Sequence, residues 1–225
     1  MNKKLLMIPG LMCNEKLWSK IELNNYKSLP IPKEDSIEKI IKSLDKTISK
    51  EEKKVNIIGF SLGGYLALNY LTKYPNKVNK VLVISSSINN LSSKEILLRE
   101  NNLKRMDIHK IRTLSNNAIN QLLENKNDTE NISLIKEMFD DLGVDTYKQQ
   151  LLATLERENL LDMLKEVSNK VLFIASNNDS LVDLTNIKKL CNTNKNFDLK
   201  LLDSSSHMIP LEYDYFLYKE ILNFF

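Results

Sequence analysis

A glycine-rich turn between a predicted strand and a predicted helix limits the fold of this chain more than any other feature. Residues 55–58 (Val-Asn-Ile-Ile) form an apolar run typical of a buried strand, and residues 59–64 continue as Gly-Phe-Ser-Leu-Gly-Gly. The helical pattern of residues 62–74 follows and ends at Pro75. Three of the five glycines of the chain lie in this turn. Because a sharp turn leaves no room for side chains beside its central residue, Ser61 is expected at its tip, with a strained backbone and an exposed hydroxyl.

Apolar runs and helical periodicities alternate along much of the chain. Short patterns of buried strands occur at residues 5–8, 81–84, 171–175 and 197–202, besides 55–58. Helical patterns occur at residues 37–48, with Asp35 or Ser36 as the N-cap, and at residues 187–191 and 211–225. Strands that alternate with helices favour the α/β class, with a mostly parallel sheet covered on both faces.

The middle of the chain departs from this alternation. Residues 88–168 contain helical periodicities but no convincing strand. We therefore expect a core formed by residues 1–87 and 169–225, interrupted by a helical insertion of about 80 residues. Since the insertion has no Gly/Ser-rich linker, it is expected to pack against the core.

Composition excludes several classes of protein. The 225 residues include 32 Lys and Arg and 29 Asp and Glu, and the net charge of +3 is spread along the chain, so nucleic acid is not an expected partner. No apolar run reaches the length of a membrane-spanning helix. Cys13 and Cys191 lie far apart, and a reducing cytoplasmic location is expected. The basic and apolar start up to Cys13 also suggests a lipidated signal sequence, which Pro9-Gly10 and the bulky Met12 disfavour.

A serine hydroxyl becomes a good nucleophile only when a base accepts its proton, and the chain has two histidines, His109 and His207. His109 lies in the helical insertion among Asp107, Lys110 and Arg112, where a solvated surface histidine is expected. His207 follows the last predicted strand, in a loop that leads to the final helix. We therefore predict His207 as the general base.

The acid that orients the base should follow the preceding strand of the sheet. Residues 171–175 are followed by Ser-Asn-Asn-Asp, and Asp179 is therefore the predicted acid. Asp183 is better explained as the N-cap of the next helix, and Asp203 as a carboxylate of a turn. The order Ser61, Asp179, His207 is the one found in α/β-hydrolases.

These motifs together resemble the α/β-hydrolase superfamily over nearly the whole chain, and specifically its small bacterial esterase and thioesterase-like members. The resemblance is carried by Leu-Leu-Met-Ile-Pro-Gly-Leu at 5–11, Ile-Gly-Phe-Ser-Leu-Gly-Gly at 58–64, Ser-Asn-Asn-Asp at 176–179 and Ser-His-Met at 206–208. It implies a six-stranded sheet in which residues 26–29 form a reduced strand, and a cap formed by the insertion. It also implies that the Leu11 and Leu62 N–H groups form an oxyanion hole.

The resemblance implies a serine hydrolase that cleaves a small carboxylic ester or thioester through an acyl-enzyme, without a metal or a cofactor. An acyl carrier is a further expected partner. Two alternatives stay open, because the fold does not fix the chemistry: a C–C bond hydrolase or lyase that uses the same triad, and a ligand-binding or signalling protein. A serine at the turn argues against a dehalogenase, which carries an aspartate there.

The four arginines of the chain, Arg99, Arg105, Arg112 and Arg157, all lie in the predicted insertion. Lysine supplies the positive charge elsewhere, so the planar guanidinium is a candidate for binding a carboxylate or phosphate on the substrate or on a carrier. Solvated helix faces and ordinary ion pairs are the alternative explanation. Cys13 follows the predicted oxyanion loop and is expected to pack in the core, with a pocket-lining position as the alternative.

Overall fold

The computed structural model describes residues 4–109 and 113–225. The strands are β1 (Leu5–Ile8), β2 (Tyr26–Ser28), β3 (Val55–Phe60), β4 (Val78–Ile84), β5 (Lys170–Ser176) and β6 (Phe197–Leu202). The α-helices are α1 (Ile37–Ile48), α2 (Leu62–Lys73), α3 (Ser93–His109), α4 (Asn116–Asn120), α5 (Thr129–Ala153), α6 (Leu161–Lys165), α7 (Thr185–Thr193), α8 (Ile209–Glu212) and α9 (Asp214–Phe224). Two short 3-10 helices, η1 (Glu15–Trp18) and η2 (Pro75–Lys77), complete the set.

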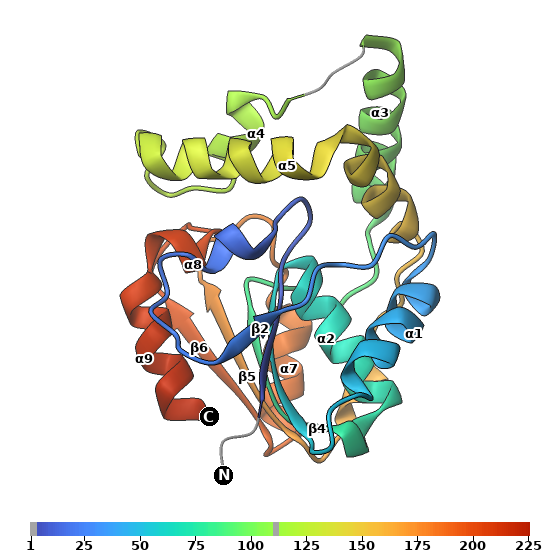
Figure 1. Ribbon diagram of the computed structural model, residues 1–225, viewed down its shortest axis with the longest axis vertical. Helices are drawn as coiled ribbons and strands as arrows, with labels where there is room; N and C mark the ends of the chain where they lie inside the picture. The colour runs from blue at the N-terminus through green and yellow to red at the C-terminus, as the bar shows by residue number, and fades with distance from the viewer. Residues whose placement is uncertain (1–3, 110–112) are drawn as a thin grey trace.

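The six strands form one parallel sheet in the order β2-β1-β3-β4-β5-β6, which confirms the predicted fold class. The register pairs Ile8 with Gly59 and Phe60 with Ile84, so the carboxyl ends of β1, β3 and β4 lie side by side. Figure 1 shows α4 and α5 across this carboxyl edge, above the tips of the strands. The loops that leave this edge therefore lie between the sheet and the helices of the insertion.

Alternate residues of each strand pack on opposite faces of the sheet, as the pleat requires. On β3, Val55 and Ile57 join a core layer with α1, α2 and α7, whereas Ile58 and Phe60 join a second layer with η1, α8 and α9. Burial on both faces explains why β1, β3, β4 and β5 are apolar runs rather than alternating patterns. The edge strand β6 differs from the buried strand predicted there, because only Phe197 of its six residues is buried. Helix α1 begins after Ser36, whose side chain accepts a hydrogen bond from the Lys39 N–H.

Helices α3 to α6 occupy the segment between β4 and β5, and the described part of residues 88–168 contains no strand. The Leu160 N–H donates to the Ile88 carbonyl at 2.9 Å, which joins the end of this segment to its beginning. Asn14 donates to Asp141 on α5 at 2.9 Å, a contact between the core and the insertion. Gly143 interrupts α5 with φ 78° and ψ 160°, values that only glycine adopts without strain.

The last predicted helix, 211–225, differs in detail from the structure. It is divided into α8 and α9 at Tyr213, whose φ of −133° and ψ of 37° are not helical, and α8 begins two residues earlier than expected, with Pro210 in its first turn. Among the described residues, no helix is both long enough and apolar enough to cross a membrane.

Candidate active site

Ser61 lies at the tip of the turn between β3 and α2, with φ 49° and ψ −116°. Its N–H donates to the Ile84 carbonyl at 2.8 Å, which anchors the turn to β4. A Cβ atom on Gly63 would overlap the carbonyl oxygens of Ile8 and Pro9, so only glycine allows α2 to begin this close to β1. The local sequence thus forces the serine hydroxyl outward at the carboxyl edge of the sheet.

His207 lies in the loop between β6 and α8, and its side chain is buried. Its Nε2 is 3.0 Å from Ser61 Oγ, and its Nδ1 is 2.7 Å from Asp179 Oδ2. Since a carboxylate can only accept, Nδ1 carries the proton and Nε2 of the neutral ring is free to accept from the serine. The Phe60 ring packs against the imidazole with 5.3 Å between the centroids.

Asp179 follows β5 and its side chain is 1% exposed. Its Oδ1 accepts from the Leu181 N–H at 2.9 Å, which leaves Oδ2 for His207 and fixes the orientation of the carboxylate. A serine, an imidazole and a buried carboxylate in this arrangement can generate a nucleophile at neutral pH.

The two other aspartates considered from the sequence lie elsewhere. Asp203 accepts from Asn177 Nδ2 at 3.0 Å, in keeping with a carboxylate of a turn. Asp183 accepts from the Thr185 N–H at 2.9 Å, but the N-cap of α7 is the next residue, Leu184, so the predicted N-cap position is wrong by one residue. In the part of the chain that the structure describes, neither carboxylate contacts His207.

Leu11 and Leu62 line the same cavity as Ser61. Leu62 is the first residue of α2, and Leu11 follows β1 in a turn closed by a 3.1 Å hydrogen bond from the Cys13 N–H to the Gly10 carbonyl. Within residues 4–109 and 113–225, neither the Leu11 nor the Leu62 N–H donates to a protein acceptor. The start of α2 also contributes the positive end of the helix dipole. These two N–H groups are therefore free to bind a developing negative charge.

The cavity that contains Ser61 and His207, called the Ser61 cavity below, has a volume of about 310 Å³. Its walls are mostly apolar side chains from the sheet edge and from the insertion, including Phe60, Leu98 and Ile135. The volume is at the lower end of the range for small-molecule sites. Of the described residues, the charged side chains that line it are Glu95, Arg99 and Arg157.

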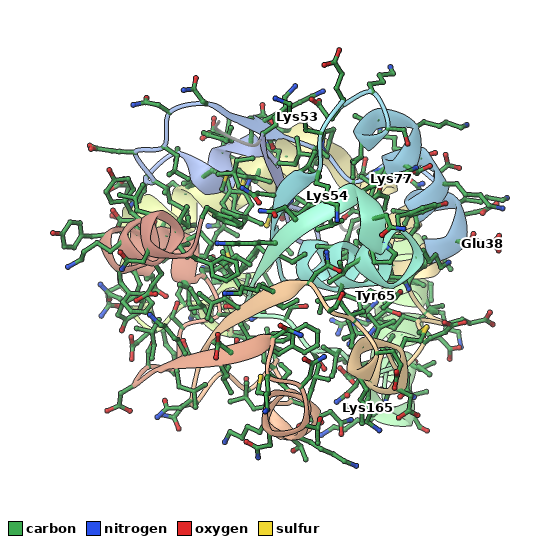
Figure 2. The ribbon with its side chains drawn as sticks, turned by 90° about the horizontal axis from the view of Figure 1, so that it is seen from below. Glu38, Lys53, Lys54, Tyr65, Lys77 and Lys165 are labelled. Carbon is green, nitrogen blue, oxygen red and sulfur yellow. The ribbon has the colours of Figure 1, made fainter. Side chains whose placement is uncertain are left out.

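The four arginines fall into different environments. Arg99 and Arg157 line the Ser61 cavity, whereas Arg105 is exposed on α3 and does not line it. Arg112 and the side chain of His109 lie outside the described part of the structure. Arg157 lies over the Tyr65 ring at 5.2 Å from its centroid, and Tyr65 is buried on α2, inward of Glu38 at the edge of the molecule in Figure 2.

Cys13 lines the Ser61 cavity and also packs against the core. The core position expected from the sequence and the alternative pocket-lining position therefore both apply. Burial raises the pKa of its thiol to about 12, against a smaller lowering by a hydrogen bond with the Gly10 backbone. The thiol is therefore protonated at neutral pH and is a poor nucleophile. Cys191 lies on α7. Among the described residues, no group of three or more His, Cys, Asp or Glu could hold a metal ion.

Sequence reasoning missed the residues of the insertion that hold the His207 loop. The Leu122 carbonyl accepts from the N–H groups of His207 and Met208, at 2.9 and 3.2 Å. The Glu212 carboxylate accepts hydrogen bonds from the Glu124 N–H, at 3.0 Å, and from the Ser206 hydroxyl. A backbone carbonyl leaves no trace in residue identity, so no sequence pattern could have indicated the first contact.

Comparisons with known proteins concern the family and the fold of the chain. A family model described as the alpha/beta hydrolase fold matches residues 34–213. A pimeloyl-acyl-carrier-protein methyl ester esterase from Wigglesworthia glossinidia brevipalpis is 29% identical over 98% of this chain and 92% of its own length. Among solved structures, MenH from S. aureus has a TM-score of 0.85 at 20% identity and covers 100% of this chain and 94% of its own. A thermophilic esterase from Thermogutta terrifontis has a TM-score of 0.81 at 18% identity, with 99% and 89% covered.

Proposed function

The chain belongs to the α/β-hydrolase family, and from this premise we propose that it is a serine hydrolase that cleaves a carboxylic ester or thioester. The observation that carries the proposal is the continuous path from Ser61 Oγ through His207 to the buried Asp179, with contacts of 3.0 and 2.7 Å. The path opens into a mostly apolar cavity that an acyl group can enter.

In the first half of the reaction, Ser61 Oγ attacks the carbonyl carbon of the substrate. His207 Nε2 accepts the hydroxyl proton, and Asp179 stabilises the imidazolium through the hydrogen bond at Nδ1. When the tetrahedral intermediate collapses, His207 returns the proton to the leaving alcohol or thiol. The acyl group remains on Ser61 as an ester.

The second half repeats these steps with water. His207 accepts a proton from the water that attacks the acyl-enzyme, and then donates it to Ser61 Oγ as the acid is released. The N–H groups of Leu11 and Leu62 are assigned to the oxyanion in both halves, since both line the cavity and both are free of protein acceptors among the described residues.

We assign residues 88–168 the role of a cap, because Leu98, Arg99 and Ile135 on its helices form walls of the Ser61 cavity. The relative from Wigglesworthia is named for a methyl ester on an acyl-carrier protein. That name supports an ester substrate for this chain, and it supports an acyl carrier as the partner that delivers it.

The test is hydrolysis of p-nitrophenyl esters from acetate to decanoate by the wild type and by Ser61→Ala, together with labelling by a fluorophosphonate. We expect turnover and labelling in the wild type, and a loss of roughly 10⁴-fold or more in the variant. The acyl chain length of the ester with the highest kcat/KM indicates the size of the acyl-binding part of the cavity. Labelling without ester turnover would redirect the assignment to C–C bond cleavage, and saturable binding without labelling would contradict a hydrolase.

A further inference from the structure

Two arginines that are distant in the sequence share the Ser61 cavity. Arg99 lies on α3, and its Nη1 donates to Thr154 Oγ1 at 2.7 Å. Arg157 lies between α5 and α6, with its guanidinium over the ring of Tyr65. Tyr65 is about one helical turn from Ser61 on α2, so the stacking holds Arg157 against the helix that begins at the nucleophile.

The guanidinium groups have hydrogen-bond donors to spare. Arg157 Nε is buried and has no hydrogen-bond partner in the described structure. Among the side chains that the structure describes, which leave out that of Asp107, no carboxylate lies within 4.0 Å of the Arg99 or Arg157 guanidinium. Glu95 is the acidic residue of the cavity, but its Oε2 accepts from both the N–H and the hydroxyl of Ser92, each at 2.8 Å. An arginine offers five N–H donors, so most donors of these two groups have no protein acceptor among the described residues.

The charges of the cavity lining are unbalanced. Among the described residues, Arg99 and Arg157 contribute two positive charges to the lining, and Glu95 contributes one negative charge. Burial, followed by the proximity of Arg157, lowers the pKa of Arg99 to about 10, so the guanidinium is still charged at neutral pH. The two partly dehydrated cations repel each other, and Glu95 attracts both of them. An anionic group of a substrate beside the two guanidinium groups would reduce the repulsion further and accept from their free donors.

We propose that Arg99 and Arg157 bind an anionic group, a carboxylate or a phosphate, on the ester or thioester that Ser61 attacks. This inference rests on the proposed function and names its substrate class. The planar fork of each guanidinium suits the two oxygens of such a group. The anion is carried either by the acyl chain or by the leaving group, and the two sources are separated by the choice of substrate.

The experiment compares two matched pairs of esters. Mono-p-nitrophenyl adipate and p-nitrophenyl hexanoate have the same chain length, but only the first carries a carboxylate on the acyl group. The second pair, 4-acetoxybenzoate and phenyl acetate, places the carboxylate on the leaving group. The variants are Arg99→Gln and Arg157→Gln, and Arg105→Gln is the matched control because this exposed arginine of α3 does not line the cavity.

We expect Arg99→Gln and Arg157→Gln to lower kcat/KM for the anionic member of one pair by roughly 10- to 100-fold, and for its neutral partner by less than about 3-fold. The pair that responds identifies the source of the anion. Arg105→Gln should leave every ratio unchanged. Equal losses on charged and neutral esters, or no loss on either, would overturn the inference and leave the proposed hydrolase in place.

Binding measurements separate this inference from the proposed function. Titration of Ser61→Ala with adipate in a calorimeter needs no turnover. Adipate binding should disappear in double variants that combine Ser61→Ala with Arg99→Gln or Arg157→Gln, and it should persist in the double variant with Arg105→Gln. Absence of ester hydrolysis with intact adipate binding would reject the hydrolase and keep the anion site. If neither ester hydrolysis nor adipate binding is observed, both the proposed hydrolase and the anion site are rejected. If a glutamine variant does not fold, Arg99→Lys and Arg157→Lys retain the charge and the stem, and should lose selectivity in part because the fork is gone.

Discussion

The His207 N–H donates to the Leu122 carbonyl at 2.9 Å, so the candidate base is held from the helical insertion as well as from the sheet. Leu122 follows α4, and the residues just after it are fixed in turn by Glu212 on α8. The geometry of the base therefore depends on how the insertion is attached to the core.

The first prediction concerns Glu212 as a positioning residue. Its two oxygens accept from the N–H groups of Glu124 and Asn125, at 3.0 and 2.8 Å, and from the Ser206 hydroxyl. Glu212→Gln leaves one oxygen for these donors, so the free energy of unfolding should fall by about 1–3 kcal/mol. We expect kcat to fall by about 10-fold with little change in KM, because His207 is displaced while the cavity is intact.

The matched control for Glu212 is Glu220→Gln, on α9. Glu220 pairs with Lys200 on β6, and the side chains are 13% and 48% exposed. Among the described residues, no hydrogen bond joins Glu220 to the loop of His207, so its loss should lower stability without a specific effect on kcat. Thermal unfolding and steady-state kinetics of both variants decide the matter. A similar fall in kcat for the two variants would show that Glu212 has no particular role in placing His207.

The second prediction concerns acid stability. A hydrogen bond from Tyr213 is the largest cause that holds the pKa of Glu124 below its ordinary value of 4.5. Desolvation opposes it, and hydrogen bonds from Ser204 Oγ and the Ser205 N–H add smaller lowering effects. A carboxyl whose pKa is lower in the folded state stabilises the fold fully above pH 4.5, and this contribution is lost as the pH falls through the lower folded pKa. Glu124→Gln should remove that part of the pH dependence.

The measurement is urea unfolding of the wild type and of Glu124→Gln between pH 7 and pH 3. The variant should be less stable at pH 7, and the two curves should converge as the pH falls below 4.5. Because Glu124 is largely exposed, the difference should shrink in high salt. Parallel curves over the whole range would contradict the assignment.

The third prediction separates Cys13 from the chemistry of the cavity. Burial holds the pKa of its thiol at about 12, so almost no thiolate exists at pH 8. We expect iodoacetamide at pH 8 to leave esterase activity unchanged over the time in which a free thiol would be alkylated. Cys13→Ala should keep kcat within about 3-fold, at a cost in stability of about 1 kcal/mol for the lost packing. Rapid inactivation by the reagent would contradict this and would indicate an accessible thiolate.

The sequence was sufficient to predict the residues whose position follows from local structure. Ser61 could be placed because its turn is encoded within six consecutive residues, and Asp179 and His207 because parallel strands deliver their following loops to one edge. The contact between Leu122 and His207 could not be predicted, since it joins backbone atoms across the fold. Its formation depends on tertiary packing that no local pattern records.

The placement of the arginines could be predicted from the sequence only in part. Glu95, Arg99 and Asn102 have spacings of four and three, which place them on one face of a helix, and all three line the cavity. Arg105 is three residues after Asn102 and continues the same spacing, yet it is exposed and does not line the cavity. Helical spacing could therefore not have separated Arg105 from Arg99. It also could not have shown that Arg157 lines the same cavity as Arg99, because that placement depends on the path of the chain after α5.

The last prediction compares two glycines at which a side chain would be unfavourable for different reasons. A Cβ at Gly63 would overlap the backbone of Ile8 and Pro9, whereas a Cβ at Gly143 meets nothing within 4 Å. Gly63→Ala should therefore cost more than about 4 kcal/mol, or prevent folding, because neither backbone can move without displacing β1 or α2. Gly143→Ala should cost about 1–3 kcal/mol through its φ of 78° alone, and the protein should fold and keep Ser61 reactive toward a fluorophosphonate. Thermal unfolding of both variants tests this order, and a Gly63→Ala protein as stable as Gly143→Ala would refute the close approach of α2 to β1.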